Sequence, residues 1–168
     1  YSWKYGETFV KNWNSLAVLG LFAVICLAVA GLGAIFTTGS VRDWYPTLQK
    51  PSWNPPSWLF GPVWTILYLM MAIAVWLVWR KREFVDVNSS LALFVFQLIL
   101  NAAWSPLFFG LKNPMAGLLD IVPLWAAILA TLISFWKISP AAGVLLVPYW
   151  LWVSFATALN FAIWKLNR

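Results

Sequence analysis

The chain of 168 residues is 62% hydrophobic and only 10% charged, with a mean hydropathy of +0.79. A water-soluble domain of this size does not tolerate such a composition, so we expect an integral membrane protein. The net charge of +6 is assigned to lysines and arginines that meet anionic lipid, because the sequence offers no basic, solvated domain for nucleic acid. One cysteine and no histidine exclude a disulfide framework within one chain, zinc or histidine catalysis and the usual haem ligand.

Five apolar stretches are long enough to cross a bilayer, which takes about 20 residues per helix. They cover residues 16–36, 62–79, 91–111, 115–136 and 140–164. Such continuous apolar runs exclude a transmembrane barrel, whose strands alternate. The predicted fold is therefore an all-α integral membrane protein, a bundle of five transmembrane helices forming one domain over residues 1–168, with a structured loop between helices one and two.

The N-terminal residues 1–15 mix charged and aromatic side chains and are predicted to lie at the membrane interface. Asn14 or Ser15 is the expected cap of the first helix. Further along, Asn88, Ser89 and Ser90 are predicted to cap the third helix. Short connections at residues 112–114 and 137–140 predict that helices three, four and five are antiparallel neighbours.

The segment 44–68 carries four tryptophans, two tyrosines and five prolines in 25 residues. Proline fixes φ and removes a hydrogen-bond donor, so this loop loses little entropy when it is ordered. One interpretation is a stiff lid over a flat apolar ligand. The other is an aromatic belt at the membrane interface, which Trp and Tyr form in most membrane proteins.

Three of the predicted helices carry stripes of aromatic and polar side chains. Their members are Trp64 and Tyr68 in the second helix, Gln97, Asn101, Trp104 and Ser105 in the third, and Tyr149, Trp152, Ala156 and Asn160 in the fifth. Spacings of three and four residues place each set on one helix face. If the stripes converge, they line a small-molecule pocket. The alternative is that the amides hydrogen-bond between helices while the aromatic rings fill the core.

Asp120 is the only acidic residue in a predicted span, and it lies near the start of the fourth helix. Three arrangements stay open for it: a position near the interface, an ion pair with Arg or Lys, or a hydrogen bond to backbone across the bundle. Pro106, Pro123 and Pro148 are expected to kink or locally open helices three, four and five.

Taken together, these motifs resemble those of the TspO/translocator protein family, also called tryptophan-rich sensory proteins. The similarity covers about residues 16–166. It rests on Trp44, Tyr45, Leu48, Lys50, Pro51, Trp53, Pro55, Pro56, Trp64, Tyr68, Asn101, Trp104, Pro106, Asp120, Pro148, Tyr149, Trp152, Phe155, Ala156, Leu159 and Asn160.

The resemblance implies a five-helix protein, commonly a homodimer, whose pocket lies beneath the loop at residues 37–61. It implies binding of porphyrins, especially protoporphyrin IX, and of sterols and benzodiazepine-type drugs. The implied pocket residues are Tyr45, Pro55, Trp64, Tyr68, Asn101, Trp104, Trp152 and Ala156. Some bacterial members are credited with light-dependent breakdown of protoporphyrin, which assigns a tentative catalytic role to Trp64 and Trp152.

Porphyrin is favoured over sterol, because Phe161 stands where the proposed cholesterol motif needs a Tyr. A flat macrocycle with carboxylate edges suits aromatic walls and a rim holding Arg42 and Lys50. Protoporphyrin IX is thus expected as ligand, with no cofactor required and no metal site. Three functions stay open: a tetrapyrrole-binding receptor or sensor, a light-dependent porphyrin-degrading enzyme, and a transporter of porphyrin or sterol.

Overall fold

The computed structural model describes residues 3–168, with side chains from residue 14 onward. Its long helices are α1 (Trp3–Asp43), α2 (Phe60–Trp79), α3 (Asn88–Ser105), α4 (Pro114–Ile138) and α5 (Pro140–Leu166). Short turns η1 (Tyr45–Thr47) and η2 (Ser57–Leu59) lie in the loop after α1, and η3 (Pro106–Gly110) extends α3. Five of these helical segments are long and apolar enough to span a membrane, which confirms the predicted fold class.

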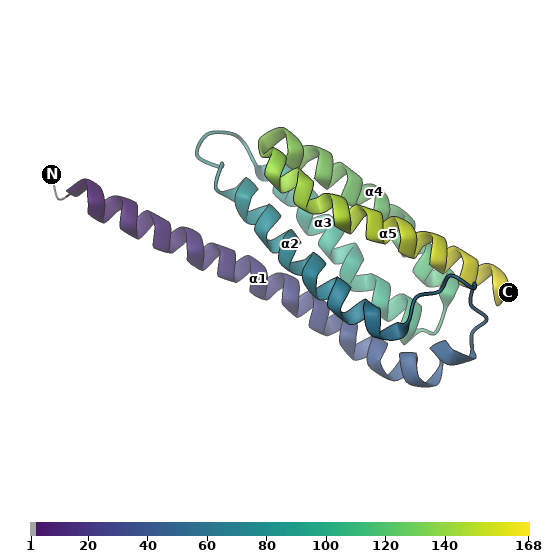
Figure 1. The fold of residues 1–168 in the computed structure, drawn as a ribbon. Helices are drawn as coiled ribbons and strands as arrows, with labels where there is room; N and C mark the ends of the chain where they lie inside the picture. The colour runs from purple at the N-terminus through teal and green to yellow at the C-terminus, as the bar shows by residue number, and fades with distance from the viewer. Residues whose placement is uncertain (1–2) are drawn as a thin grey trace.

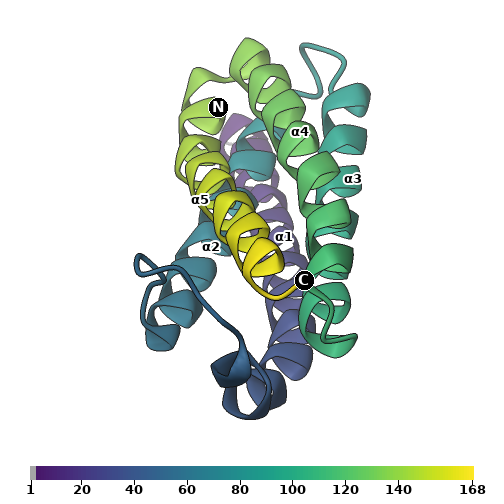
Figure 2. The ribbon, with the colours of Figure 1, turned by 90° about the vertical axis from the view of Figure 1, so that its right-hand side faces the viewer.

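The helices pack side by side in a ring, in the order α1, α2, α5, α4, α3 (Figures 1 and 2). Short connections join α3 to α4 and α4 to α5, and both pairs are packed neighbours, as predicted. The longer connection from α1 to α2 lies at the end of the bundle where α5 also finishes (Figure 2). This topology brings the proline-rich loop and the C-terminus to the same membrane side.

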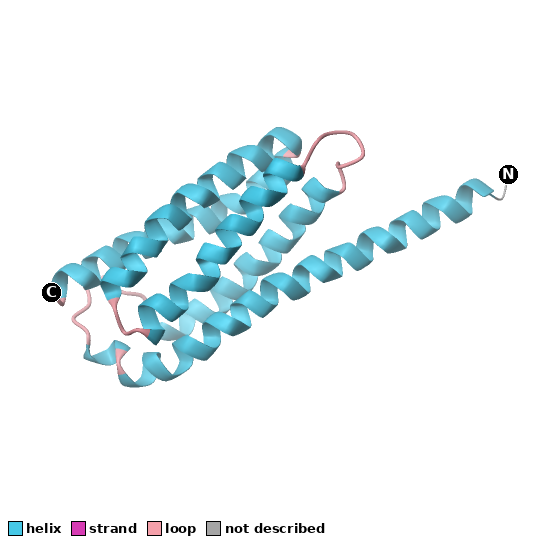
Figure 3. Cartoon of the chain, turned by 180° about the vertical axis from the view of Figure 1, so that it is seen from behind, coloured by secondary structure: helices cyan, strands magenta, loops and turns pink. Residues whose placement is uncertain are grey.

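Helix α1 differs from the prediction. It begins at Trp3, so neither Asn14 nor Ser15 caps it, and residues 3–15 continue the helix rather than forming a separate segment. Residues 1 and 2 lie outside the described part of the chain. At 1.5 Å per residue its 41 residues span about 60 Å, roughly twice the hydrocarbon thickness. The N-terminal part of α1 accordingly runs well beyond the bundle (Figures 1 and 3).

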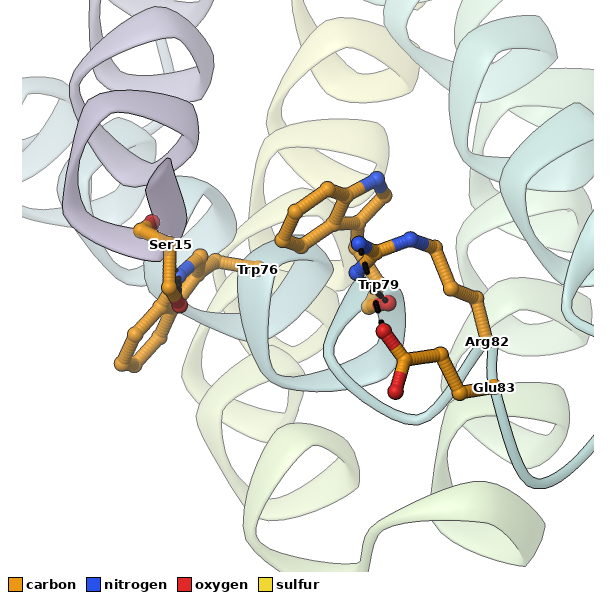
Figure 4. Close-up of polar contacts among 5 residues, drawn as sticks. All are labelled: Ser15, Trp76, Trp79, Arg82 and Glu83. Atoms are coloured by element: carbon orange, nitrogen blue, oxygen red, sulfur yellow. Dashed lines mark hydrogen bonds and ion pairs between the residues drawn. The ribbon is translucent and has the colours of Figure 1, made fainter. Parts of the chain in front are cut away.

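One contact fixes α1 where it leaves the bundle (Figure 4). The Trp76 indole on α2 donates to the Ser15 carbonyl at 2.8 Å and to the Ser15 hydroxyl at 3.2 Å. On the adjoining turn, the Arg82 guanidinium lies 3.4 Å from the centre of the Trp79 ring and 3.9 Å from the Glu83 carboxylate. Ser15 thus holds α1 against α2 instead of starting the helix.

The ends of α3 also refine the prediction. Asn88, Ser89 and Ser90 do not cap the helix; the carboxylate of Asp86 instead accepts from the first N–H of α3, that of Asn88, at 2.9 Å. At the other end Pro106 opens the helix into the π-helical turn η3, as expected of a proline that removes a backbone donor. The Asn113 side chain then caps α4 by accepting from two backbone N–H groups, those of Met115 and Ala116.

The contact between α4 and α5 depends on Gly143. A Cβ atom at this position would lie 2.6 Å from Trp136 Cε3 and 2.9 Å from the Trp136 Cα. Because Cα belongs to the backbone of α4, a side-chain rotation cannot relieve this clash. Glycine therefore sets how closely these two helices approach, as small residues do in membrane bundles.

We predict that Gly143→Ala destabilises the bundle by about 1–3 kcal/mol, the usual cost of overpacking. Gly20→Ala is the matched control, because a Cβ there meets nothing within 4 Å. Its stability should equal or slightly exceed that of the parent, since alanine is the better helix former. Thermal unfolding in detergent measures both variants, and equal melting temperatures would contradict the assigned role of Gly143.

Candidate ligand-binding site

A cavity of about 560 Å³ lies inside the loop end of the bundle. This volume falls within the roughly 300–1,000 Å³ of small-molecule sites. All five long helices contribute to its wall, together with η3, Tyr45 and Ser57. Arg42 is the single charged residue among those that line it. The site is therefore mostly apolar, with a few polar groups that could orient a ligand.

Most of the predicted pocket residues meet at this cavity. Its wall includes Tyr45, Trp64, Tyr68, Asn101, Trp104, Trp152 and Ala156. Pro55 is not among the lining residues. The three stripes thus converge at one cavity, and their role in ligand contact stays a prediction.

A hydrogen-bonded chain forms the floor of the cavity and joins α2, α3 and α5. The Tyr68 hydroxyl donates to Asn101 Oδ1 through a short hydrogen bond. Asn101 Nδ2 donates to the Tyr149 hydroxyl at 2.7 Å, and that hydroxyl donates to Gln97 Oε1 at 2.8 Å. Tyr149 and Gln97 are 0% and 1% exposed. The interhelical hydrogen bonds expected of the amides Asn101 and Asn160 are thus present, and both side chains also line the cavity.

Aromatic rings make up the rest of the wall near α2 and α5. The Trp64 ring centre lies 5.7 Å from that of Tyr68 and 6.2 Å from that of Tyr149. Trp152 meets Phe60 edge to face at 6.0 Å. These separations are those of interacting aromatic pairs, so the walls are held in fixed orientations. The Trp152 indole N–H is buried and has no hydrogen-bond partner among the described residues.

A second polar contact closes the cavity beside η3. Trp104 Nε1 donates to Asn160 Oδ1 at 3.2 Å, and Asn160 Nδ2 donates to the Pro114 carbonyl at 2.7 Å. The Trp104 ring also stacks on Phe108, with centres 5.1 Å apart. Gly117 permits this packing, because a Cβ there would lie 2.7 Å from the Phe108 ring.

Asp120 does not line the cavity. Its side chain is 8% exposed, and one carboxylate oxygen, Oδ2, is buried without a hydrogen-bond partner among the described residues. Among the described residues Asp120 forms neither the ion pair nor the hydrogen bond to backbone considered for it, and its position near the membrane interface stays a prediction. Within the part of the chain whose side chains are described, no group of three His, Cys, Asp or Glu side chains could hold a metal ion.

The exposed residues of the cavity wall all lie on one side of it. Its lining residues on α3, η3, α4 and α5 are all buried or half-buried. Every exposed lining residue belongs to α1, η2 or α2: Gly31, Ala34, Thr38, Arg42, Ser57, Gly61 and Thr65. We infer that the cavity opens between α1 and α2, where mostly small side chains and Arg42 reach the surface.

The loop after α1 is held together by Lys50. Its ammonium donates to the carbonyls of Tyr45 and Leu48, both at 2.8 Å, and to that of Pro46 at 3.3 Å. It also lies 5.0 Å from the centre of the Tyr45 ring. This corrects the expectation that the rim of the pocket holds Lys50 as well as Arg42, because Lys50 does not line the cavity and its three donors are already used within the loop.

Two further contacts attach the loop to the bundle. The Asn167 side chain near the C-terminus pairs with the backbone of Gln49, accepting from its N–H and donating to its carbonyl, both at 2.9 Å. The Tyr45 hydroxyl donates to Asn54 Oδ1 at 2.7 Å. Burial raises the pKa of Tyr45 to about 12, an effect that this hydrogen bond partly offsets. Tyr45 is thus neutral at physiological pH and remains a donor.

Sequence reasoning missed the contribution of α1 and η3 to the site. Gly31, Gly33 and Ala34 form part of the wall, as do Phe108 and Phe109 in the π-helical turn. The cluster of small residues in an otherwise bulky span was the available signal for α1. Pro106 was the signal for η3, because an opened turn rotates the rings that follow it.

We predict that Lys50→Met loosens the loop, because it keeps an apolar stem over Tyr45 but removes three hydrogen bonds. Lys137→Met, at the opposite end of the bundle, is the control. Limited proteolysis with chymotrypsin should cut the 44–58 segment at least several-fold faster in Lys50→Met than in the parent or the control. Equal cleavage rates in all three proteins would show that Lys50 does not order the loop.

Five apolar helices around an aromatic cavity, with a clamped proline-rich loop at one end, define a multi-pass integral membrane protein with a ligand-sized site. Comparison with known sequences agrees with this class. The sequence model of the TspO/MBR family matches residues 22–165. The chain belongs to the TspO/MBR family.

Individual relatives support the assignment. The chain is 50% identical to the tryptophan-rich protein TspO of Chlorobaculum tepidum, over 92% of this chain and 98% of that protein. It is 40% identical to the human translocator protein, over 82% of each chain. It is 38% identical to the tryptophan-rich sensory protein of Cereibacter sphaeroides, over 87% of this chain and 92% of the relative.

Proposed function

We propose that this protein is a membrane receptor or sensor that binds a tetrapyrrole, with protoporphyrin IX as the expected ligand, in the cavity beneath the loop that joins α1 to α2. This loop, expected at residues 37–61, covers residues 44–59, because α1 continues to Asp43 and α2 begins at Phe60. The observation that carries the proposal is the cavity itself, about 560 Å³ in volume and walled by Trp64, Trp104 and Trp152. Flat rings on a flat macrocycle give large apolar contact at low entropic cost. The names of the relatives, a sensory protein and a translocator protein, fit a ligand-responsive membrane protein.

Transport of porphyrin or sterol is the alternative. The names of the animal relatives favour it, whereas the single open side of the cavity favours binding over passage. The homodimer implied by the family resemblance also stays a prediction. The location of the proposed site is the same whether the protein is a receptor or a transporter, and whether it is a monomer or a homodimer.

The first test of binding uses a variant whose larger side chain fills the cavity. Ala156 lies on the cavity wall of α5, so Ala156→Phe should occupy the ligand's space and reduce protoporphyrin affinity at least tenfold. Saturable quenching of tryptophan fluorescence measures the affinity. Leu151→Phe is the control, because Leu151 is 56% exposed on the same helix and faces away from the cavity. Unchanged binding by a folded Ala156→Phe protein would place the ligand elsewhere.

Light-dependent porphyrin breakdown is a second candidate, favoured by the presence of both Trp64 and Trp152 in the wall. In this reaction dioxygen is the oxidant and accepts the electrons that the photoexcited porphyrin loses. Each indole would act as a relay, which is oxidised in one step and takes an electron back from the porphyrin in the next, so that it returns to its starting state. Trp64→Phe and Trp152→Phe keep an aromatic wall but remove the readily oxidised indole.

We predict that both variants keep binding within a few-fold, while porphyrin loss under light and oxygen slows at least tenfold. Absorbance of the bound porphyrin follows the reaction, with anaerobic illumination as the control. Turnover equal to that of the parent in both variants would exclude electron transfer through these indoles. If the parent itself does not degrade porphyrin under light and oxygen, this second candidate function is excluded and the receptor function remains.

A further inference from the structure

The open side of the cavity is polar at one end and apolar at the other. Along α1, Arg42 and Thr38 lie nearest the loop, and Ala34 and Gly31 follow deeper in the bundle. The distance from Arg42 to Gly31 along the helix is about 16 Å, at 1.5 Å per residue. A molecule seated between α1 and α2 thus meets a cation and hydroxyls at the interface end and small apolar residues below.

Arg42 is free to bind a ligand. No side chain in the described part of the protein forms a hydrogen bond or an ion pair with it. Four other cations near the membrane surface are engaged: Lys50 by three carbonyls, and Arg80, Arg82 and Arg168 over the rings of Trp76, Trp79 and Trp164. Arg42 also lies at the last turn of its span, where a charged partner stays close to water.

We infer that Arg42 is the anion-binding group of this cavity and selects ligands that carry a carboxylate on one edge of an apolar body. This inference rests on the proposed function and adds the ligand's chemical class to it. The guanidinium presents a planar fork of donors that matches a carboxylate with two parallel hydrogen bonds. Because Arg42 is the only charged lining residue, the acid must lie at the loop end, with the macrocycle directed toward Trp64 and Trp152.

The position of Arg42 at the C-terminal end of α1 offers a competing explanation for this residue. An arginine in the last turn also interacts favourably with the helix dipole, and its side chain can extend to the lipid headgroups. That role predicts a change in stability and no discrimination between acidic and neutral ligands. The two explanations therefore differ in a measurable way.

The test compares protoporphyrin IX with its dimethyl ester, which has the same macrocycle without the charge, on protein in nanodiscs of neutral lipid. The parent should prefer the acid. Arg42→Gln should weaken binding of the acid about tenfold or more, the value expected for a lost charged hydrogen bond, and leave the ester unchanged. Arg42→Lys should retain part of the preference, since it keeps the charge but not the planar fork.

Lys112→Gln is the matched control, because it removes one exposed positive charge at the same end of the bundle without touching the cavity. Equal loss of acid and ester in Arg42→Gln would show a structural role and overturn the inference. The inference would also be overturned if Arg42→Gln bound the acid as tightly as the parent while Ala156→Phe abolished binding. That result would leave the proposed function unaffected. If the parent binds neither porphyrin, the proposed function fails, and the inference fails with it.

Discussion

The chain of hydrogen bonds from Tyr68 through Asn101 and Tyr149 to Gln97 determines how the other parts of the bundle are arranged. In hydrocarbon these groups have no water to bond with, and leaving one unpaired costs about 1–3 kcal/mol or more. Each donor therefore has to meet its acceptor, which fixes the rotation of α2, α3 and α5 relative to one another. Gln97 also approaches Met71 on α2, with 4.0 Å between Nε2 and Sδ, so the chain returns to the helix where it began.

That fixed rotation is what directs the aromatic stripes at one cavity. With Asn101 held at the floor, Trp104 lies one turn nearer the loop and bonds to Asn160 of α5. Similarly, Tyr149 at the floor places Trp152 and Ala156 on the wall above it. The hydrogen-bonded chain and the aromatic cavity wall thus both result from side chains spaced three or four residues apart on the same helix faces.

Much of this arrangement could be predicted from sequence because amide and aromatic residues in membrane spans are costly and therefore informative. The stripe on α3 identified a face, and the structure places that face at the cavity. Helix α1 could not be interpreted in this way, since its span carries no stripe of amide and aromatic side chains, and its small residues indicate close helix contact as readily as a cavity wall. Lys50 was misassigned for a different reason: its loop folds back on itself, and three backbone carbonyls reach the ammonium only in the folded loop.

The open side between α1 and α2 follows from how little α1 is buried. In the most apolar 18-residue stretch of α1, 6% of the residues are buried within the bundle, compared with 39% in the corresponding stretches of α2 and α4. Helix α1 is attached to α2 through Ser15 and Trp76 at one end and reaches the loop at the other. Between these attachments Gly31, Gly33 and Ala34 form part of the cavity wall, and we propose that an apolar ligand dissolved in the bilayer enters there. In the receptor that we propose, α3, α4 and α5 close the other sides of the site, whereas a carrier would need a second exit.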